Sequence, residues 1–207
     1  MHPPAGGYRK WHFPKENMMK TQLMIQSTPN PNALKFVLNA PVKTSGNWTY
    51  KNTTECAGNP LALAIFELDP RIKEVYFFDN YVTVTQNGNA DWEELEDKIR
   101  AAILEGIKDH NPDFQTPDLE KKTVAVNSDS PELAQISSIL DQTVRPALQM
   151  DGGDIQLVDY KDNKLRVFYQ GACGSCPSST MGTLKAIENI LKDQFNPDVV
   201  VELADAV

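Results

Sequence analysis

Residues 155–191, IQLVDYKDNKLRVFYQGACGSCPSSTMGTLKAIENIL, contain the pattern that decides the fold around the chain's paired cysteines. Two strand-like runs, IQLVDY and KLRVFYQ, flank Asp162-Asn163, a dipeptide typical of a tight hairpin turn. The second run leads into a loop that contains Cys173 and Cys176. A helical pattern follows, with an apolar face formed by Met181, Leu184, Ile187 and Leu191. We therefore predict a hairpin, a cysteine loop and a helix in direct succession.

The segments on either side complete a small α+β unit. A helix is predicted upstream, with Ser130 as its N-cap and Pro131 in its first turn. Its apolar stripe is Leu133, Ile136, Leu140, Val144 and Ala147, and the motif DGGD (151–154) ends it. Downstream, DVVVEL predicts a last strand. The predicted order over residues 131–207 is α-β-β-α-β.

Residues 21–115 predict a second α+β unit. Strands are expected at QLMIQS (22–27) and ALKFVLN (33–39), and a hairpin at EVYFF and YVTVTQ about Asp79-Asn80. NPLALAIFEL (59–68) predicts a short helix, and Asp91 and Glu94 have the spacing of a capping box for a longer one. The apolar face of that longer helix is Trp92, Leu95, Ile99, Ala102, Ile103 and Ile107. Two helices on a small antiparallel sheet would bury these faces.

The fold class is therefore α+β, with two small domains. Residues 1–20, rich in proline and glycine, predict a disordered extension, and the polar residues 116–130 predict a linker. Hydrophobic content of 41% indicates a globular protein. No apolar run approaches the roughly 18 residues of a membrane helix, so we expect no membrane association.

The net charge and the number of cysteines exclude some classes of function. The formal net charge is −8, and no basic run exceeds Lys121-Lys122, which argues against nucleic acid as a partner. Three cysteines in 207 residues predict no disulfide framework and favour a reducing, cytoplasmic compartment. The early basic residues, with no acid before Glu16, leave an organellar matrix as the alternative, with residues 1–20 as a targeting segment.

Cys173 and Cys176 are the candidate functional residues. They lie where a strand ends and a helix begins, and Pro177 suits a first helical turn. The positive end of the helix dipole should lower the pKa of these thiols and favour the thiolate, which binds metal. The plainer interpretation is that two small residues are buried at a tight turn.

Counting ligands makes the prediction sharper. Zinc and iron–sulfur clusters usually take four protein ligands. Residues 131–207 contain two cysteines and no histidine; His110 and Cys56 lie elsewhere, and we expect Cys56 to be a bystander. Two chains could provide four thiolates across a symmetric dimer. The alternatives are a zinc-bridged interaction module and a thiol–disulfide oxidoreductase, although the βαβ context of the latter is missing.

Several segments also resemble a known family. MDGGDIQLVDY and GACGSCPSSTMGTLKAIENIL resemble the C-terminal domain of the NifU family. STPNPNALKF, NPLALAIFEL and YVTVT resemble the N-terminal domain of Nfu-type proteins. The resemblance implies a non-enzymatic scaffold and carrier that holds an iron–sulfur cluster, typically 4Fe–4S, with Cys173 and Cys176 as ligands.

The resemblance implies partners too. Apo iron–sulfur proteins would receive the cluster, and upstream cluster-assembly proteins would donate it. The ligand count, independently of the resemblance, predicts that the loaded form is a homodimer. The N-terminal domain would contact partners.

The motif MDGGD (150–154) allows two interpretations. Gly152 and Gly153 can simply supply backbone turns between a helix and a strand. Alternatively, Asp151 or Asp154 lies near the cysteine loop and tunes it or touches a partner. Acids on loops are usually solvated, and this favours the first interpretation.

Overall fold

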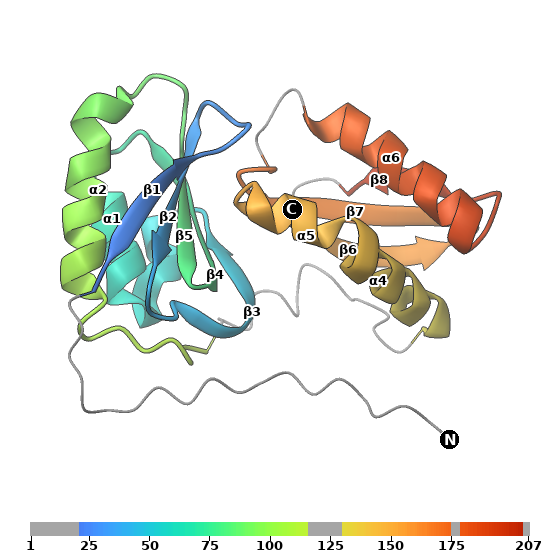
Figure 1. Ribbon diagram of the computed structural model, residues 1–207, viewed down its shortest axis with the longest axis horizontal. Coiled ribbons are helices and arrows are strands. Elements are labelled where there is room, and N and C mark those ends of the chain that lie inside the picture. The colour runs from blue at the N-terminus through green and yellow to red at the C-terminus, as the bar shows by residue number, and fades with distance from the viewer. Residues whose placement is uncertain (1–20, 116–129, 175–178, 205–207) are drawn as a thin grey trace.

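The computed structural model describes residues 21–115, 130–174 and 179–204. The chain folds into an N-terminal half (residues 21–115) and a C-terminal half (residues 130–204) that lie side by side, each with its own sheet (Figure 1). The predicted extension 1–20 and linker residues 116–129 fall outside the described residues. Within the described ranges, no helix is long and apolar enough to cross a membrane.

The N-terminal half is a five-stranded antiparallel sheet with helices on one face. Its strands, in the order β1-β2-β5-β4-β3, are β1 (Leu23–Ser27), β2 (Ala33–Leu38), β5 (Tyr81–Gln86), β4 (Ile72–Asp79) and β3 (Lys43–Tyr50). A 3₁₀ helix, η1 (Thr53–Gly58), precedes α1 (Pro60–Leu68), and α2 (Trp92–Gly106) closes the half. The predicted pair of helices on an antiparallel sheet is confirmed.

Local signals explain most of these elements. The β4–β5 hairpin turns at Asp79, whose φ of 45° lies in the left-handed region that aspartate tolerates. Asp91 caps α2, but its carboxylate accepts the backbone N–H of Glu93, one residue earlier than the predicted capping box requires. Strand β3 was not predicted, because its sequence KTSGNWTY is mostly polar.

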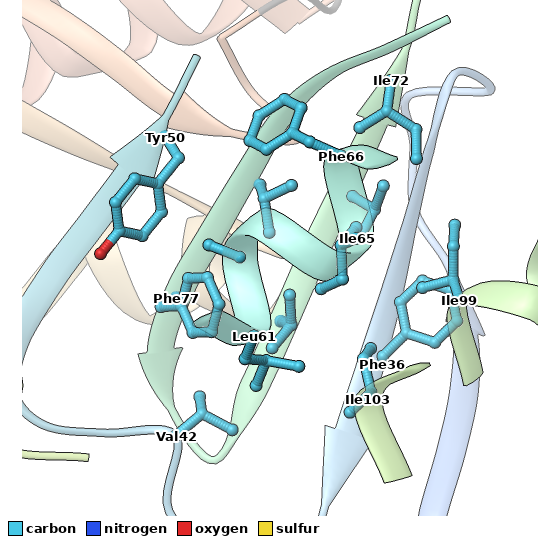
Figure 2. Packing of buried hydrophobic residues seen from close by; sticks show 14 of the residues in the cluster. Phe36, Val42, Tyr50, Leu61, Ile65, Phe66, Ile72, Phe77, Ile99 and Ile103 are labelled. Carbon is cyan, nitrogen blue, oxygen red and sulfur yellow. The ribbon is translucent and has the colours of Figure 1, made fainter. Parts of the chain in front are cut away.

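The core of the N-terminal half lies between the sheet and the two helices (Figure 2). Strand alternation decides which side chains enter it. On β4, Val75 and Phe77 belong to this core, whereas Tyr76 does not. On β5, Val82 and Val84 belong to it. On the opposite face of the sheet, side chains of β2, β4 and β5 are also buried, and the C-terminal half lies against this face (Figure 1).

The C-terminal half has three helices and a three-stranded sheet in the described residues. The helices are α4 (Pro131–Thr143), α5 (Arg145–Met150) and α6 (Ser179–Gln194). The strands, in the order β6-β7-β8, are β6 (Gly153–Lys161), β7 (Lys164–Gly171) and β8 (Val200–Leu203). The hairpin turn at Asp162-Asn163 is confirmed, with φ of 52° and 61°. Helix α6 crosses over the sheet so that β8 pairs parallel to β7.

One prediction for this half is wrong. The single helix predicted before the hairpin is two, and the order becomes α-α-β-β-α-β. Pro146 lies in the first turn of α5, where it cannot donate an N–H to the carbonyl of Gln142, so the first helix ends near Val144. The break shifts the apolar face, so that Leu148 is buried and the predicted Ala147 is exposed.

Ionisation of His110 should make the stability of the N-terminal half depend on pH. His110 Nε2 lies 2.7 Å from the carbonyl oxygen of Val42, and the ring stacks on Phe77. Burial lowers the pKa of His110, and the charge of Lys43 acts in the same direction. The folded chain therefore binds a proton less readily than the unfolded chain, and stability should fall as pH drops below about 6.5, the unfolded pKa.

This expectation can be measured by denaturant unfolding between about pH 7 and pH 5.5, the range that brackets an ordinary histidine. The variant His110→Gln should lose most of the pH slope in this range. An unchanged slope in the variant would contradict the assignment to His110.

Candidate functional site

The site is built on the turn that follows β7, residues 171–174, named here the cysteine turn. The N–H of Gly174 donates to the carbonyl of Gly171 at 3.1 Å, and the N–H of Ala172 donates to the carbonyl of Gly152 at 3.1 Å. Cys173 is 5% exposed and packs in the core of the C-terminal half. Cys176 and Pro177 lie outside the described residues, and α6 begins at Ser179. The structure therefore places one of the two candidate ligands.

The motif MDGGD lies directly against this turn. A Cβ atom on Gly153 would lie 2.6 Å from Cys173 Sγ and 2.6 Å from the carbonyl oxygen of Gln170. Gly152 has φ of +83°, which only glycine adopts easily. The glycines do form a backbone turn, as one interpretation predicts. In addition, the missing side chain of Gly153 lets Cys173 Sγ approach the backbone of β6 closely, a role that the sequence did not indicate.

Asp154 is not a solvated loop acid. It lies on β6, is 3% exposed, and pairs with Gln170 of β7 beside the cysteine turn. Burial raises the pKa of Asp154, although the backbone N–H of Ile155 and the Arg145 guanidinium favour its charged form. The expectation that the acids of this motif are solvated is wrong for Asp154, whereas Asp151 is exposed.

The N-terminal half also contributes to the site, which sequence reasoning missed. Asn30 Nδ2 donates to the carbonyl of Ala172 at 2.9 Å, and Thr83 Oγ1 donates to the carbonyl of Gly152 at 2.8 Å. Lys35 Nζ donates to the carbonyls of residues 149 and 150 at 3.0 and 3.2 Å. Burial lowers the pKa of Lys35, against the opposing effect of the Asp151 charge.

Three further side chains of β4 and β5 lie near the cysteine turn. Burial is the main cause that raises the pKa of both Tyr76 and Tyr81, and the nearby Asp154 and Cys173 act in the same direction. Burial also raises the pKa of Glu74, against the charge of Lys51. The described ranges contain no cluster of three or more His, Cys, Asp or Glu that could hold a metal ion.

Cys56 lies in a different environment. It is 1% exposed, sits in the core of the N-terminal half, and donates its S–H to the carbonyl of Asn52 at 3.3 Å. Burial raises the pKa of the Cys56 thiol to about 11, with the charge of Glu55 adding to the effect. A buried, protonated thiol is a poor metal ligand.

Fold and site together define a class of protein. It has two α+β halves and a Cys-x-x-Cys segment between a strand and a helix, where the preceding strands form a hairpin and not the βαβ unit of a thiol oxidoreductase. A family model described as "NifU-like domain" matches residues 136–202. A second, described as "Scaffold protein Nfu/NifU N terminal", matches residues 23–110. The chain belongs to the Nfu family of NifU-like proteins.

Relatives agree with this membership. The chain is 34% identical over 187 residues to "NifU-like protein 4, mitochondrial" of Arabidopsis thaliana. It is 32% identical over 171 residues to "NFU1 iron-sulfur cluster scaffold homolog, mitochondrial" of Homo sapiens. These alignments cover 88% and 82% of this chain and, in both cases, 66% of the relative's own length.

Among solved structures, a solution structure of a NifU-like protein from Saccharomyces cerevisiae superposes with a TM-score of 0.43 at 23% identity. The superposition covers 52% of this chain and 96% of the yeast protein.

Proposed function

We propose that this chain is an iron–sulfur cluster scaffold and carrier, and not an enzyme, in which Cys173 and Cys176 bind the cluster. The observation that carries the proposal is the ligand count. The chain has three cysteines, and the third, Cys56, is buried with a raised pKa in the core of the other half. Two thiolates per chain leave a four-iron cluster incomplete, so we propose a 4Fe–4S cluster shared by two chains.

The parts of the chain divide this work. We propose that residues 131–207 form the cluster-binding domain, that residues 21–115 form the domain that contacts partners, and that residues 116–130 link them. The cluster is the cargo. Apo iron–sulfur proteins would receive it, and upstream cluster-assembly proteins would donate it, as the scaffold relatives' names suggest.

Transfer would proceed by ligand exchange. An incoming thiol of the recipient loses its proton and forms one Fe–S bond, one Fe–S bond to the carrier breaks, and the released thiolate takes up a proton. No electron moves, and the cluster is conserved. A helix N-terminus beside the cysteines would favour the thiolate form that each step needs.

The names of the same two relatives bear on the cellular compartment in which this chain acts. Both are named as mitochondrial proteins, and this favours the organellar alternative over the cytoplasmic one. We propose that the chain acts in the mitochondrial matrix, and fractionation of cells that express the tagged chain would test this.

Cluster binding and dimerisation should be linked, because a ligand that binds only the dimer stabilises the dimer. The apo-protein should sediment mainly as a monomer at low concentration. The brown, loaded form should sediment as a dimer with one four-iron cluster per two chains. Analytical ultracentrifugation, followed at both protein and cluster absorbance, measures both species. A coloured monomer would contradict the shared site, and a colourless dimer containing zinc would support the zinc-bridged alternative.

A further inference from the structure

The face of the N-terminal sheet opposite α1 and α2 is in contact with the cysteine turn (Figure 1). We name it the docking face and define it by the following residues: Asn30, Lys35, Glu74, Tyr76, Tyr81 and Thr83. The first is on the β1–β2 loop, and the others are on β2, β4 and β5. On β4, Glu74 and Tyr76 occupy the positions that alternate with the core residues Val75 and Phe77.

The docking face holds the C-terminal half by its backbone. Among the described residues, Asn30, Lys35 and Thr83 donate four hydrogen bonds to main-chain carbonyls of residues 149, 150, 152 and 172. Three of these carbonyls lie on the segment that leads into β6, and the fourth belongs to Ala172, the residue before Cys173. Contact is tight as well as polar, because a Cβ on Gly152 would lie 3.0 Å from Thr83 Oγ1.

Docking also occupies the space around the candidate ligand. A Cβ on Gly171 would lie 2.9 Å from Tyr76 Cδ1, and a Cβ on Gly174 would lie 3.5 Å from Glu74 Oε2. Tyr76 thus packs at one end of the cysteine turn, and a carboxylate lies beside the other. An anionic cluster and the thiolates of a second chain would meet the ring of Tyr76 here, and the negative charge of Glu74 whenever that carboxyl is ionised.

The same interface contains polar atoms that water would satisfy better. Within the described residues, Glu74 Oε2 is buried and has no hydrogen-bond partner, and the buried hydroxyls of Tyr76 and Tyr81 have no partner beyond each other. Buried polar groups without partners oppose the state that buries them. Separation of the halves would expose these atoms to water, and this gain offsets part of the free energy that the docking bonds supply.

We propose that the N-terminal half is an intramolecular cover for the cysteine turn. It docks on the turn while no cluster is bound, and it moves off before a second chain can contribute its cysteines. The inference rests on the proposed sharing of a cluster between two chains. Cluster loading and docking then exclude each other, and recipients would meet the N-terminal half only after it has been released.

The test removes docking bonds from the full chain while keeping side-chain size. Among the described residues, the N-terminal half donates five side-chain hydrogen bonds to the C-terminal half, and Lys35→Met with Thr83→Val deletes three of them. The bonds from Asn30 to Ala172 and from Asn47 to Asp154 remain. The matched control is Lys43→Met with Thr85→Val. Lys43 is buried but bonds within its own half, to Phe114, and Thr85 Oγ1 has no hydrogen-bond partner among the residues that the structure describes. Thr83→Val alone is a milder variant that keeps the β-branched shape.

The first readouts need no iron. Small-angle scattering reports the separation of the halves, and mass spectrometry reports the alkylation rate of Cys173. Because one net hydrogen bond shifts an equilibrium roughly two- to twelvefold, loss of three should raise the open population, and with it the alkylation rate, about tenfold or more. The radius of gyration should increase with it. The control pair should have the alkylation rate and the radius of gyration of the parent. Thr83→Val alone should give values between those of the parent and those of Lys35→Met with Thr83→Val.

Three results would refute the proposal that the N-terminal half covers the cysteine turn. The apo parent could already scatter as the opened variant does, the control pair could open the chain equally, or Cys173 could react at one rate in all variants. Cluster reconstitution then separates this inference from the proposed function. Faster uptake to the same endpoint in the opened variant supports the cover. An absence of cluster in every variant would refute the proposed function while the iron-free measurements still decide the docking.

Discussion

Cys173→Ser and Cys176→Ser are each expected to abolish cluster binding, with bound iron falling by more than about tenfold. The physical reason is the symmetry of the proposed site. One substitution removes two of four thiolates from the dimer, and a serine hydroxyl is a much weaker ligand for iron. The measurement is iron and sulfide per chain after anaerobic reconstitution, with a Mössbauer spectrum to identify the cluster type.

The matched control is Cys56→Ser, which removes a thiol without touching the cysteine turn. Cys56 is buried in the core of the N-terminal half, so the variant should be slightly less stable but should bind iron like the parent. A colourless Cys56→Ser protein would show that Cys56 helps to hold the cluster. The ligand count on which the shared site rests would then be wrong.

Gly153→Ala should destabilise the C-terminal half by about 1–3 kcal/mol or more, the usual cost of forcing an extra group into a packed site. The added Cβ would lie 2.6 Å from Cys173 Sγ, 2.6 Å from the carbonyl oxygen of Gln170 and 2.9 Å from the backbone nitrogen of Cys173. Two of these three atoms belong to backbone that cannot rotate away. The cysteine turn must therefore shift, and cluster uptake should fall as well.

Gly182→Ala is the control for this prediction. Gly182 lies in α6 with nothing within 4 Å of an added Cβ, so the substitution should stabilise the helix by about 0.5–1 kcal/mol. Denaturant unfolding followed by circular dichroism gives both free energies, and hydrogen exchange of β6 and β7 assigns the loss to the C-terminal half. Equal stability of Gly153→Ala and the parent would mean that the turn does not approach Cys173 as described.

Local sequence signals were sufficient for most of the fold. The two hairpins carry their own turn chemistry at Asp79-Asn80 and Asp162-Asn163. The apolar period of α2 identifies Leu95, Ile99 and Ile103, all of which are buried. These features depend on neighbours in the chain, which a sequence displays directly.

The misses have physical reasons. Strand β3 forms because β4 offers it a pairing edge, and pairing can recruit a polar sequence that has little propensity of its own. Pro146 was visible, but a strong apolar period concealed the break it causes. Thr83 and Thr85 of β5 look like the solvent-facing half of an alternating strand, yet both are buried, because alternation cannot reveal that a second face is covered.

For the site too, features set by neighbouring residues could be predicted from the sequence, and features set by long-range contacts could not. The cysteine segment itself is prominent in the sequence, because Cys-x-x-Cys at a strand end is rare and chemically specific. The roles of Gly153 and Asp154 depend on β6 lying beside β7, and the docking face depends on contacts more than 60 residues apart, such as Thr83 with Gly152. In the sequence, Lys35 looks like an ordinary solvent-facing residue of β2, and only the structure shows that it is buried.

The carbonyl acceptors on the C-terminal half have a consequence for how the two halves can evolve. Every backbone carbonyl is alike whatever side chain its residue carries, so residues 149, 150 and 172 can change without loss of a docking bond. The donors Asn30, Lys35 and Thr83 must be kept, whereas the bond from Asn47 Nδ2 to Asp154 Oδ2 joins two side chains and needs both. Paired substitutions should therefore be rare at these backbone acceptors, where covariation would overlook the contact, and should be found instead at the Asn47–Asp154 pair. In chimaeras that join this N-terminal half to a relative's cluster-binding half, the two halves should still dock, provided that glycines remain at the positions of Gly152 and Gly171, which contact Thr83 and Tyr76.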